Sequence, residues 1–276
     1  MEVRSMDSGS LYIVGTGICV PGQMTHEAEM VIRGVDVVIY NVGKNELFET
    51  WLASAAKRSI NLYDFYAEGK PRDTSYAEMV EAIVSEVRAG RSVAGVFYGH
   101  PGVFVGPGFD ALKKVRAEGH HAIMLPGVSA VDCMFADLEF DPAVSGCLMI
   151  EATDLVMRLR TIDTSFPLIV WQAGVVGEHR FVNVVRAEGV DLLKDRLLES
   201  YPGDAAVVNY VAATIPGMKP FIQRGTIDGL KDLRINQSST LLIPPVEAPR
   251  LNRGALDRVR AIMEREEADR TLEAAG

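Results

Sequence analysis

The chain has 276 residues, of which 48% are hydrophobic and 24% are charged, so it is expected to form a packed core and a mostly disordered chain is excluded. Its net charge of -9 argues against a nucleic-acid partner, because binding to phosphates requires clustered lysine and arginine. The amino-terminal residues are polar and no run of about 18 apolar residues occurs, so we expect a cytoplasmic protein without a signal peptide or a membrane partner.

In chain order, apolar runs that are typical of strands alternate with helical patterns through the first half. The runs read LYIVG, DVVIY, SVAGVF and HAIML, and the clearest helical segments between them are residues 76–89 and 109–118. This alternation predicts an α/β lobe with a largely parallel sheet over residues 1–125.

The pattern changes after about Gly146. The runs LMIEA, PLIVWQ, AVVNYV and STLLIPP have fewer helical segments between them, which predicts a second α/β lobe with antiparallel strands over residues 126–250. A helical tail, 251–276, carries a short apolar stripe of Leu256, Val259 and Met263. We expect this helix to pack on its own domain rather than on a partner.

Glycine-rich turns follow the predicted strands. The stretch YGHPGVFVGPG, which begins at Tyr98, is longer than a simple strand-to-helix connection and carries His100. Because ligands lie outside the carboxyl ends of strands in open α/β sheets, it predicts a ligand site. The first loop, GTGICVPGQ, fails the dinucleotide pattern G-x-G-x-x-G, so NAD is not favoured. In LPGVSA, Ser129 is placed to cap a helix whose third residue is Asp132.

The motifs YGHPGVF, PGVSA, WQAG, YVAA and STLLIPP, in this order after a glycine-rich first loop, are similar to those of the tetrapyrrole-methylase-like class of S-adenosylmethionine (SAM) dependent methyltransferases. Within that class, INLYDFYAEGKPRDTSYAEM, GVFYGHPGVFVGP and MLPGVSAVDCMFADLEFDP resemble the borosin peptide-backbone α-N-methyltransferases. The resemblance covers about residues 10 to 246. It implies two α/β lobes with SAM in the cleft between them, and an intertwined homodimer.

The same resemblance implies a set of cofactor-binding residues. They are Tyr98, His100, Val103, Phe104, Ser129, Ala130, Gln172, Ala212, Ser239 and Thr240. A capping role for Ser129 and structural roles for the late strand ends are the alternatives. Trp171 is assigned to the core.

A backbone amide nitrogen is a poor nucleophile because its lone pair is delocalised into the carbonyl, so methyl transfer to it needs a base and a stabilised oxygen charge. Ser75 and Glu78 fit a capping box that places Tyr76 in the first turn of a helix, where the dipole and Arg72 favour a phenolate. We therefore expect Tyr76 and Arg72 to activate the amide. Packing of the tyrosines is the alternative.

The preceding loop adds two tyrosines. Tyr66 is expected to act in catalysis or to hydrogen-bond the substrate carbonyl, and Tyr63 to line the peptide channel. The resemblance places Tyr98 between cofactor and substrate, where its hydroxyl can donate to the developing oxygen charge.

No metal is expected, because the histidines lack ligand spacing, and the three widely spaced cysteines favour reduced thiols. The chain ends about 30 residues after STLLIPP without an apolar core peptide. This favours the split, bacterial arrangement, with a separate precursor peptide and a heterotetramer formed by the homodimer and precursor. A truncated chain would look the same. A tetrapyrrole C-methyltransferase and a non-catalytic scaffold that binds SAM or peptide are the alternatives.

Overall fold

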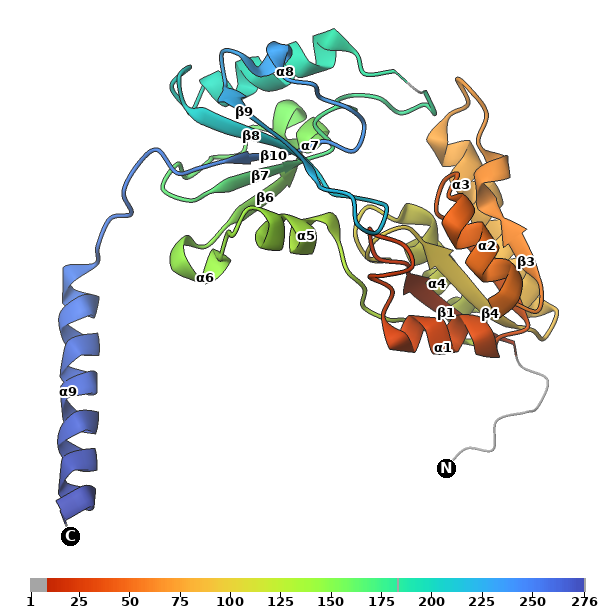
Figure 1. The fold of residues 1–276 in the computed structure, drawn as a ribbon, viewed down its shortest axis with the longest axis horizontal. Coiled ribbons are helices and arrows are strands. Elements are labelled where there is room, and N and C mark those ends of the chain that lie inside the picture. Colours follow the sequence, from red (N-terminus) through yellow and green to blue (C-terminus); the bar gives the residue numbers. More distant parts are fainter. Residues whose placement is uncertain (1–8, 183, 276) are drawn as a thin grey trace.

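The computed structural model describes residues 9–182 and 184–275 and divides them into two α/β lobes and one long terminal helix (Figure 1). The amino-terminal lobe contains a parallel sheet of order β3-β2-β4-β1-β5. Its strands are β1 (Ser10–Gly15), β2 (Val37–Asn41), β3 (Ser59–Asn61), β4 (Ser92–Phe97) and β5 (His121–Met124). The alternation of strands and helices thus predicts this lobe correctly.

Helices cover both faces of this sheet, which explains why its strands are continuous apolar runs. On one face, α1 (His26–Gly34) and α2 (Glu46–Ala55) bury Ile32 and Phe48 against Val14 and Val38. On the other face pack α3 (Arg72–Arg88) and α4 (Gly106–Ala117). A short 3-10 helix, η1 (Leu62–Phe65), precedes α3.

The carboxy-terminal lobe contains a mixed sheet of order β6-β7-β10-β8-β9, in which only β6 and β7 are parallel. Its strands are β6 (Leu148–Glu151), β7 (Leu168–Trp171), β8 (Ala206–Val211), β9 (Phe221–Thr226) and β10 (Thr240–Ile243). The predicted second lobe with antiparallel strands is therefore confirmed. Its helices are α5 (Ala130–Asp137), α6 (Pro142–Ser145), α7 (Ala152–Met157), α8 (Ala187–Leu198) and η2 (Leu230–Asp232).

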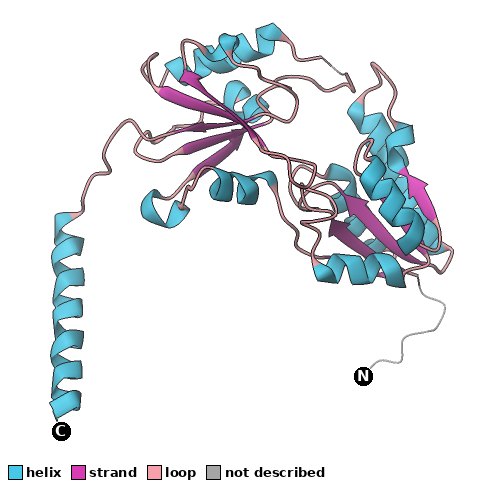
Figure 2. Ribbon diagram, viewed as in Figure 1, coloured by secondary structure: helices cyan, strands magenta, loops and turns pink. Residues whose placement is uncertain are grey.

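The two faces of this second sheet differ. α7, α8 and η2 cover one face with a core that includes Leu155, Leu193 and Leu230. The other face carries Tyr210 and packs against α5 through Met134. Figure 2 shows α5 on the side of the sheet that is turned toward the first lobe.

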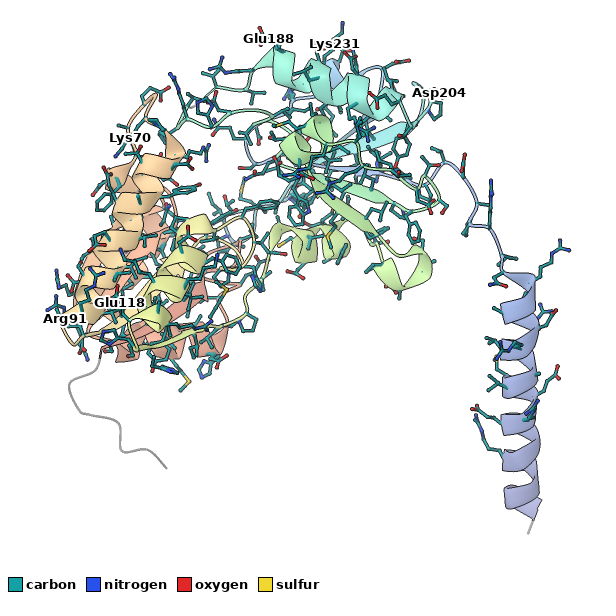
Figure 3. The ribbon with its side chains drawn as sticks, turned by 180° about the vertical axis from the view of Figure 1, so that it is seen from behind. Lys70, Arg91, Glu118, Glu188, Asp204 and Lys231 are labelled. Atoms are coloured by element: carbon teal, nitrogen blue, oxygen red, sulfur yellow. The ribbon has the colours of Figure 1, made fainter. Side chains whose placement is uncertain are left out.

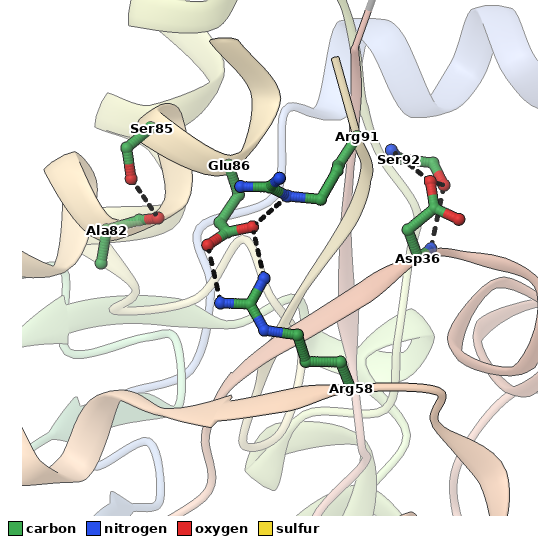
Figure 4. Close-up of polar contacts among 7 residues, drawn as sticks. All are labelled: Asp36, Arg58, Ala82, Ser85, Glu86, Arg91 and Ser92. Carbon is green, nitrogen blue, oxygen red and sulfur yellow. Dashed lines mark hydrogen bonds and ion pairs between the residues drawn. The ribbon is translucent and has the colours of Figure 1, made fainter. Parts of the chain in front are cut away.

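Ion pairs secure the first sheet at the end where its strands begin (Figure 4). The buried Glu86 carboxylate accepts hydrogen bonds from Arg58 at 2.9 and 3.0 Å and from Arg91. Burial opposes ionisation of Glu86, but these bonds outweigh it and hold its pKa below the usual 4.5. Beside them, Asp36 accepts from the Ser92 backbone N–H and hydroxyl, which lowers the pKa of Asp36.

Figure 3 places these contacts relative to the second lobe. Arg91 and Glu118 lie at the end of the first lobe that is remote from the second, whereas Lys70 lies where the two lobes approach each other. The carboxyl ends of β1, β2 and β4 lie on the side of the first lobe that faces the second lobe.

The tail forms α9 (Arg253–Ala275), which begins after Asn252 and stands away from both lobes (Figure 1). The Asn252 side chain accepts from the Ala255 N–H at 3.0 Å. Val259 and Met263 are 51% and 59% exposed, so the expectation that this stripe packs on its own domain is wrong.

Candidate functional site between two lobes

The glycines of the first and fourth strand ends hold two loops together. Gly17 and Gly99 exchange backbone hydrogen bonds of 3.3 and 3.0 Å, and their φ angles are +69° and +73°, in the left-handed region that favours glycine. A Cβ on Gly15 would lie 2.1 Å from the Gly99 carbonyl oxygen. The stretch from Tyr98 therefore needs its glycines so that the two loops can meet outside the strand ends.

A first cavity of about 490 Å³ lies at this point between the lobes. Most of the residues predicted to act here line it: Tyr66, Tyr76, Tyr98, His100, Val103, Phe104, Ser129, Ala130, Gln172, Ala212 and Thr240. The structure thus brings together residues from loops of both lobes. Their contact with a cofactor stays a prediction.

Ser239 differs from its neighbours in this set. It is fully buried, its hydroxyl accepts from the Asn236 N–H at 2.9 Å, and it does not line the first cavity. Ser238 and Thr240 line the first cavity instead. The geometry gives Ser239 a role in closing the turn before β10.

Two predicted residues also organise local backbone. His100 Nδ1 accepts from the Gly102 N–H at 2.9 Å, which folds the loop and engages this ring nitrogen. The Asp132 carboxylate accepts from the Ser129 N–H at 2.6 Å and from its hydroxyl at 2.7 Å, so the predicted cap of α5 is confirmed. The geometry favours loop organisation over base catalysis for His100.

A second cavity of about 400 Å³ adjoins the first. Both cavities are lined by Tyr66, Tyr76, Phe104 and Gln172, and by the pair Gln237 and Ser238. The second cavity adds charged and aromatic side chains: Arg72, Glu151, Glu178 and Phe181. A small molecule bound in the first cavity would therefore contact a peptide bound in the second cavity beside the two shared tyrosines, Tyr66 and Tyr76.

Backbone strain marks the boundary between the cavities. Phe104 and Gln172, from opposite lobes, have φ angles of 56° and 57°, which non-glycine residues seldom adopt. The Phe104 ring lies edge-on to Trp171, with 5.4 Å between ring centroids. Trp171 lines the first cavity, so its assignment to the core alone is wrong.

The tyrosines form one aromatic cluster at this boundary. Tyr66 stacks on Phe181 at 4.6 Å and lies 6.4 Å from Tyr76 and 5.7 Å from Tyr63, between ring centroids. Burial, and then the neighbouring Tyr76, raise the pKa of Tyr66 to about 12. Burial likewise raises the pKa of Tyr98 to about 12. Tyr63 packs behind Tyr66 and lines neither cavity.

The predicted capping box of Ser75 and Glu78 is wrong. α3 already begins at Arg72, the buried Ser75 hydroxyl donates to the Phe65 carbonyl at 3.0 Å, and Glu78 pairs with Lys70. Tyr76 consequently lies in the second turn. Because the helix dipole acts mainly within the first turn, it contributes little electrostatic stabilisation at Tyr76. The charged neighbour that lines the second cavity together with Tyr76 is Arg72.

The start of α3 is set by the other lobe. The Arg72 N–H donates to the His179 carbonyl at 3.0 Å, and its Nε donates to the Arg180 carbonyl at 3.2 Å. Gly69 donates to the Phe181 carbonyl at 2.9 Å, and the Phe181 N–H donates to Lys70 at 3.0 Å. This antiparallel contact between residues 69–72 and 179–181 closes the second cavity between the lobes. We call it the interlobe bridge.

Sequence reasoning missed several lining residues. Asn41 ends the run DVVIYN, and its position at a parallel strand's carboxyl end is a signal that could have identified it. Gln237 and Ser238 precede β10 in a turn. Glu178 and Phe181 have no comparable local signal, because the interlobe bridge brings them to the site.

Comparison with known families gives this geometry a context. The sequence profile of the tetrapyrrole (corrin/porphyrin) methylases matches residues 10–230. The chain belongs to this family. The fold agrees: uroporphyrin-III C-methyltransferase from Thermus thermophilus superposes with a TM-score of 0.62 at 21% identity, covering 86% of this chain and 95% of that one. Its complex with S-adenyl homocysteine gives 0.57 at 18% identity, covering 86% and 92%.

More similar sequences come from fungi. The methyltransferase/gymnopeptides precursor gymMA1 of Gymnopus fusipes is 41% identical over 87% of this chain and 58% of its own length. The methyltransferase/omphalotin A precursor ophMA of Omphalotus olearius is 42% identical over 86% and 58%. The type III borosin precursor aboMAa of Anomoporia bombycina is 44% identical over 86% and 28%. The chain thus spans less than two thirds of these relatives.

These relatives support the resemblance to borosin methyltransferases but not the split, bacterial arrangement. They are fungal, and their names join methyltransferase and peptide precursor in one protein. Over the described residues, no helix is both long and apolar enough to cross a membrane. In the same residues, His, Cys, Asp and Glu side chains do not gather in threes as a metal site.

Proposed function

We propose that this family member is a SAM-dependent methyltransferase that N-methylates backbone amides of a ribosomally made precursor peptide. The observation that carries the proposal is the pair of joined cavities, which share Tyr66 and Tyr76 and place Arg72 on the second side. The relatives named as methyltransferases and cyclic-peptide precursors support the same substrate class.

The first cavity suits SAM. Its volume of about 490 Å³ lies within the range of small-molecule sites, and glycine main chain at Gly99 and the flat rings of Phe104 and Trp171 suit a nucleoside. Gln172 and Ser129 add polar groups from the second lobe. When bound, SAM supplies a methyl group on a good leaving group, so the protein's task is to prepare the nucleophile.

The second cavity carries the groups for that task. Tyr76, as a phenolate stabilised by the Arg72 guanidinium, would take up the amide proton, while the amide nitrogen forms a bond to the methyl carbon and the bond from that carbon to sulfur breaks. S-adenosylhomocysteine and one proton are released. Tyr66 and Tyr98, whose pKa values are raised to about 12, stay protonated at neutral pH and can donate hydrogen bonds to the amide oxygen.

The acidic residues of the second cavity are already engaged by the protein. Glu178 accepts from the Arg180 N–H at 2.8 Å and from Arg186 at 2.9 Å, and Glu151 accepts from the Asp154 N–H at 2.7 Å. The hydrogen bonds from Arg180 and Arg186 also lower the pKa of Glu178. These charges shape the polar wall, and proton uptake is assigned to Tyr76, with Arg72 as the cation that stabilises its phenolate.

The proposal extends to assembly. A homodimer would cover the exposed apolar residues of α9, Val259, Ile262 and Met263, and this favours it over a monomer. The finer hypothesis that the precursor is a separate chain predicts that a peptide supplied in trans is methylated.

The test uses the purified chain, SAM and a synthetic peptide with the precursor sequence of the gymnopeptide relative. Fragmentation mass spectrometry should find increments of one methyl mass on backbone nitrogens. Methylation of a uroporphyrin-type tetrapyrrole instead, or SAM binding with no methylated peptide either in trans or fused to the chain, would overturn the proposal.

A further inference from the structure

Asn41 joins two of the tyrosines at the cavity boundary. It is the last residue of β2 and lines the first cavity. Its side-chain Nδ2 donates to the Tyr66 hydroxyl at 3.4 Å, and its backbone carbonyl accepts from the Tyr98 N–H at 3.2 Å. The strand end therefore holds the Tyr66 hydroxyl and the backbone of Tyr98 through one residue.

A phenol oxygen accepts hydrogen bonds and carries one proton to donate. Because Asn41 donates to Tyr66, the Tyr66 proton is not used on Asn41 and can point into the cavity. Phe181, stacked on Tyr66 at 4.6 Å, restricts the ring from the other side. Tyr76 is the second polar neighbour of this hydroxyl, and it lines the shared boundary of the cavities, so the Tyr66 proton faces that boundary.

We propose that Asn41 is a positioning residue that aims the Tyr66 hydroxyl at the carbonyl oxygen of the substrate amide. The proposal rests on the proposed function, since it assigns Tyr66 to the amide oxygen. Donation by Asn41 also polarises the Tyr66 O–H bond, because linked hydrogen bonds strengthen one another in a site of low dielectric. The activity of Tyr66 should then depend on the orientation of the Asn41 amide.

The decisive substitution keeps the shape of Asn41 and removes its donor. In Asn41→Asp, the carboxylate accepts a hydrogen bond from the Tyr66 hydroxyl and turns it away from the substrate, so we expect kcat for peptide methylation to fall about 100-fold. In Asn41→Ala the donor is lost without a competing acceptor, and we expect a fall of about tenfold. The SAM dissociation constant, measured by calorimetry, should change less than about threefold.

Two comparisons separate positioning from general damage. Asn45→Asp makes the same change four residues along the chain, where the side chain caps α2, and aspartate caps equally well, so kcat should be retained. In a Tyr66→Phe background, the Asn41 substitutions should have no further effect on kcat. The proposal would be overturned by a wild-type kcat in Asn41→Asp. It would also be overturned if the Asn41 substitutions lowered kcat equally with and without the Tyr66 hydroxyl.

A titration tests the same bond without turnover. With 3-fluorotyrosine incorporated throughout, which brings phenol pKa values into an accessible range, the Tyr66 resonance is assigned by its loss in Tyr66→Phe. The Tyr66 pKa should rise in Asn41→Ala and rise further in Asn41→Asp. An unchanged pKa would overturn the positioning role. Absence of peptide methylation by the wild type, with these shifts present, would contradict the proposed function instead.

Discussion

The two cavities differ in what builds them. The first is formed by glycine main chain and apolar rings at the ends of strands, with Gly17 and Gly99 bonded to each other. The second is formed by charged and phenolic side chains, and the interlobe bridge closes it. The fold thus supplies a cofactor-sized space, whereas the side chains proposed to act on a substrate are held in place by contact between the lobes.

This difference predicts that each cavity can be damaged separately. Substitutions in the second cavity should reduce the chemical step and spare SAM affinity, whereas substitutions of the loop glycines should do the reverse.

The largest effect is expected at the amide-activating pair. Arg72→Ala and Tyr76→Phe should each lower the single-turnover rate of peptide methylation by about a thousandfold, because Tyr76→Phe removes the group that takes up the amide proton and Arg72→Ala removes the charge that stabilises its phenolate. The SAM dissociation constant should stay within about twofold. Arg33→Ala and Tyr12→Phe, which lie outside both cavities, serve as controls. Wild-type methylation rates in either second-cavity variant would refute the pair.

The second effect concerns the first cavity. Gly99→Ala forces alanine into a φ of +73° and brings its Cβ within 3.1 Å of Ile18, so SAM affinity should fall about 30-fold by calorimetry. Gly119→Ala is the matched control, because Gly119 has a φ of +84° with nothing within 4 Å of its Cβ. It should lose stability but keep SAM affinity. Equal losses of affinity in both would show that strain alone, not the loop contact, is responsible.

The first cavity is the part of the site that the sequence predicts. Strand runs and the turn YGHPGVF identify the first cavity, because parallel strands bring their carboxyl ends to one edge. Ser129 and Asp132 are a local pair, and their cap is found as expected. Local patterns of this kind are sufficient where neighbours in sequence are neighbours in space.

Contacts between distant segments explain the failures. Ser75 and Glu78 have the spacing of a capping box, but the interlobe bridge starts the helix earlier, and their partners are Phe65 and Lys70. Phe181 reaches Tyr66 across the cleft, which no local periodicity reveals. Trp171 is apolar at a strand end, and only the packing of Phe104 from the other lobe places it in the first cavity.

The third prediction tests the interlobe bridge. Phe181→Ala removes the ring that stacks on Tyr66, so kcat/KM for the peptide should fall about tenfold, and Phe181→Tyr should restore most of it. Water entering beside Tyr66 should also lower its pKa from about 12 toward its ordinary 10. Phe221→Ala, on the edge strand β9, is the control for a lost phenyl ring. A wild-type value of kcat/KM for the peptide in Phe181→Ala would show that the interlobe bridge does not contribute to substrate turnover.

The smallest effect on activity is expected at Glu86, remote from both cavities. Glu86→Gln should leave kcat unchanged and lower the free energy of unfolding by about 1–2 kcal/mol at pH 7, because Arg58 and Arg91 lose a charged partner. Glu118→Gln is the control. Glu118 pairs with Arg88 at the surface, where solvent screens the charges, so this substitution should change the free energy of unfolding less than Glu86→Gln does.

The pH dependence of that difference follows from the direction of the shift. The Glu86 pKa is lower in the folded protein than the usual 4.5, so the stability it contributes is fully present above that value. It is lost as the pH falls through the lower, folded-state pKa, where the carboxyl group becomes neutral like glutamine. Urea unfolding of the wild type and Glu86→Gln should therefore converge in acid, and a gap that persists there would assign the contribution of Glu86 to packing rather than to charge.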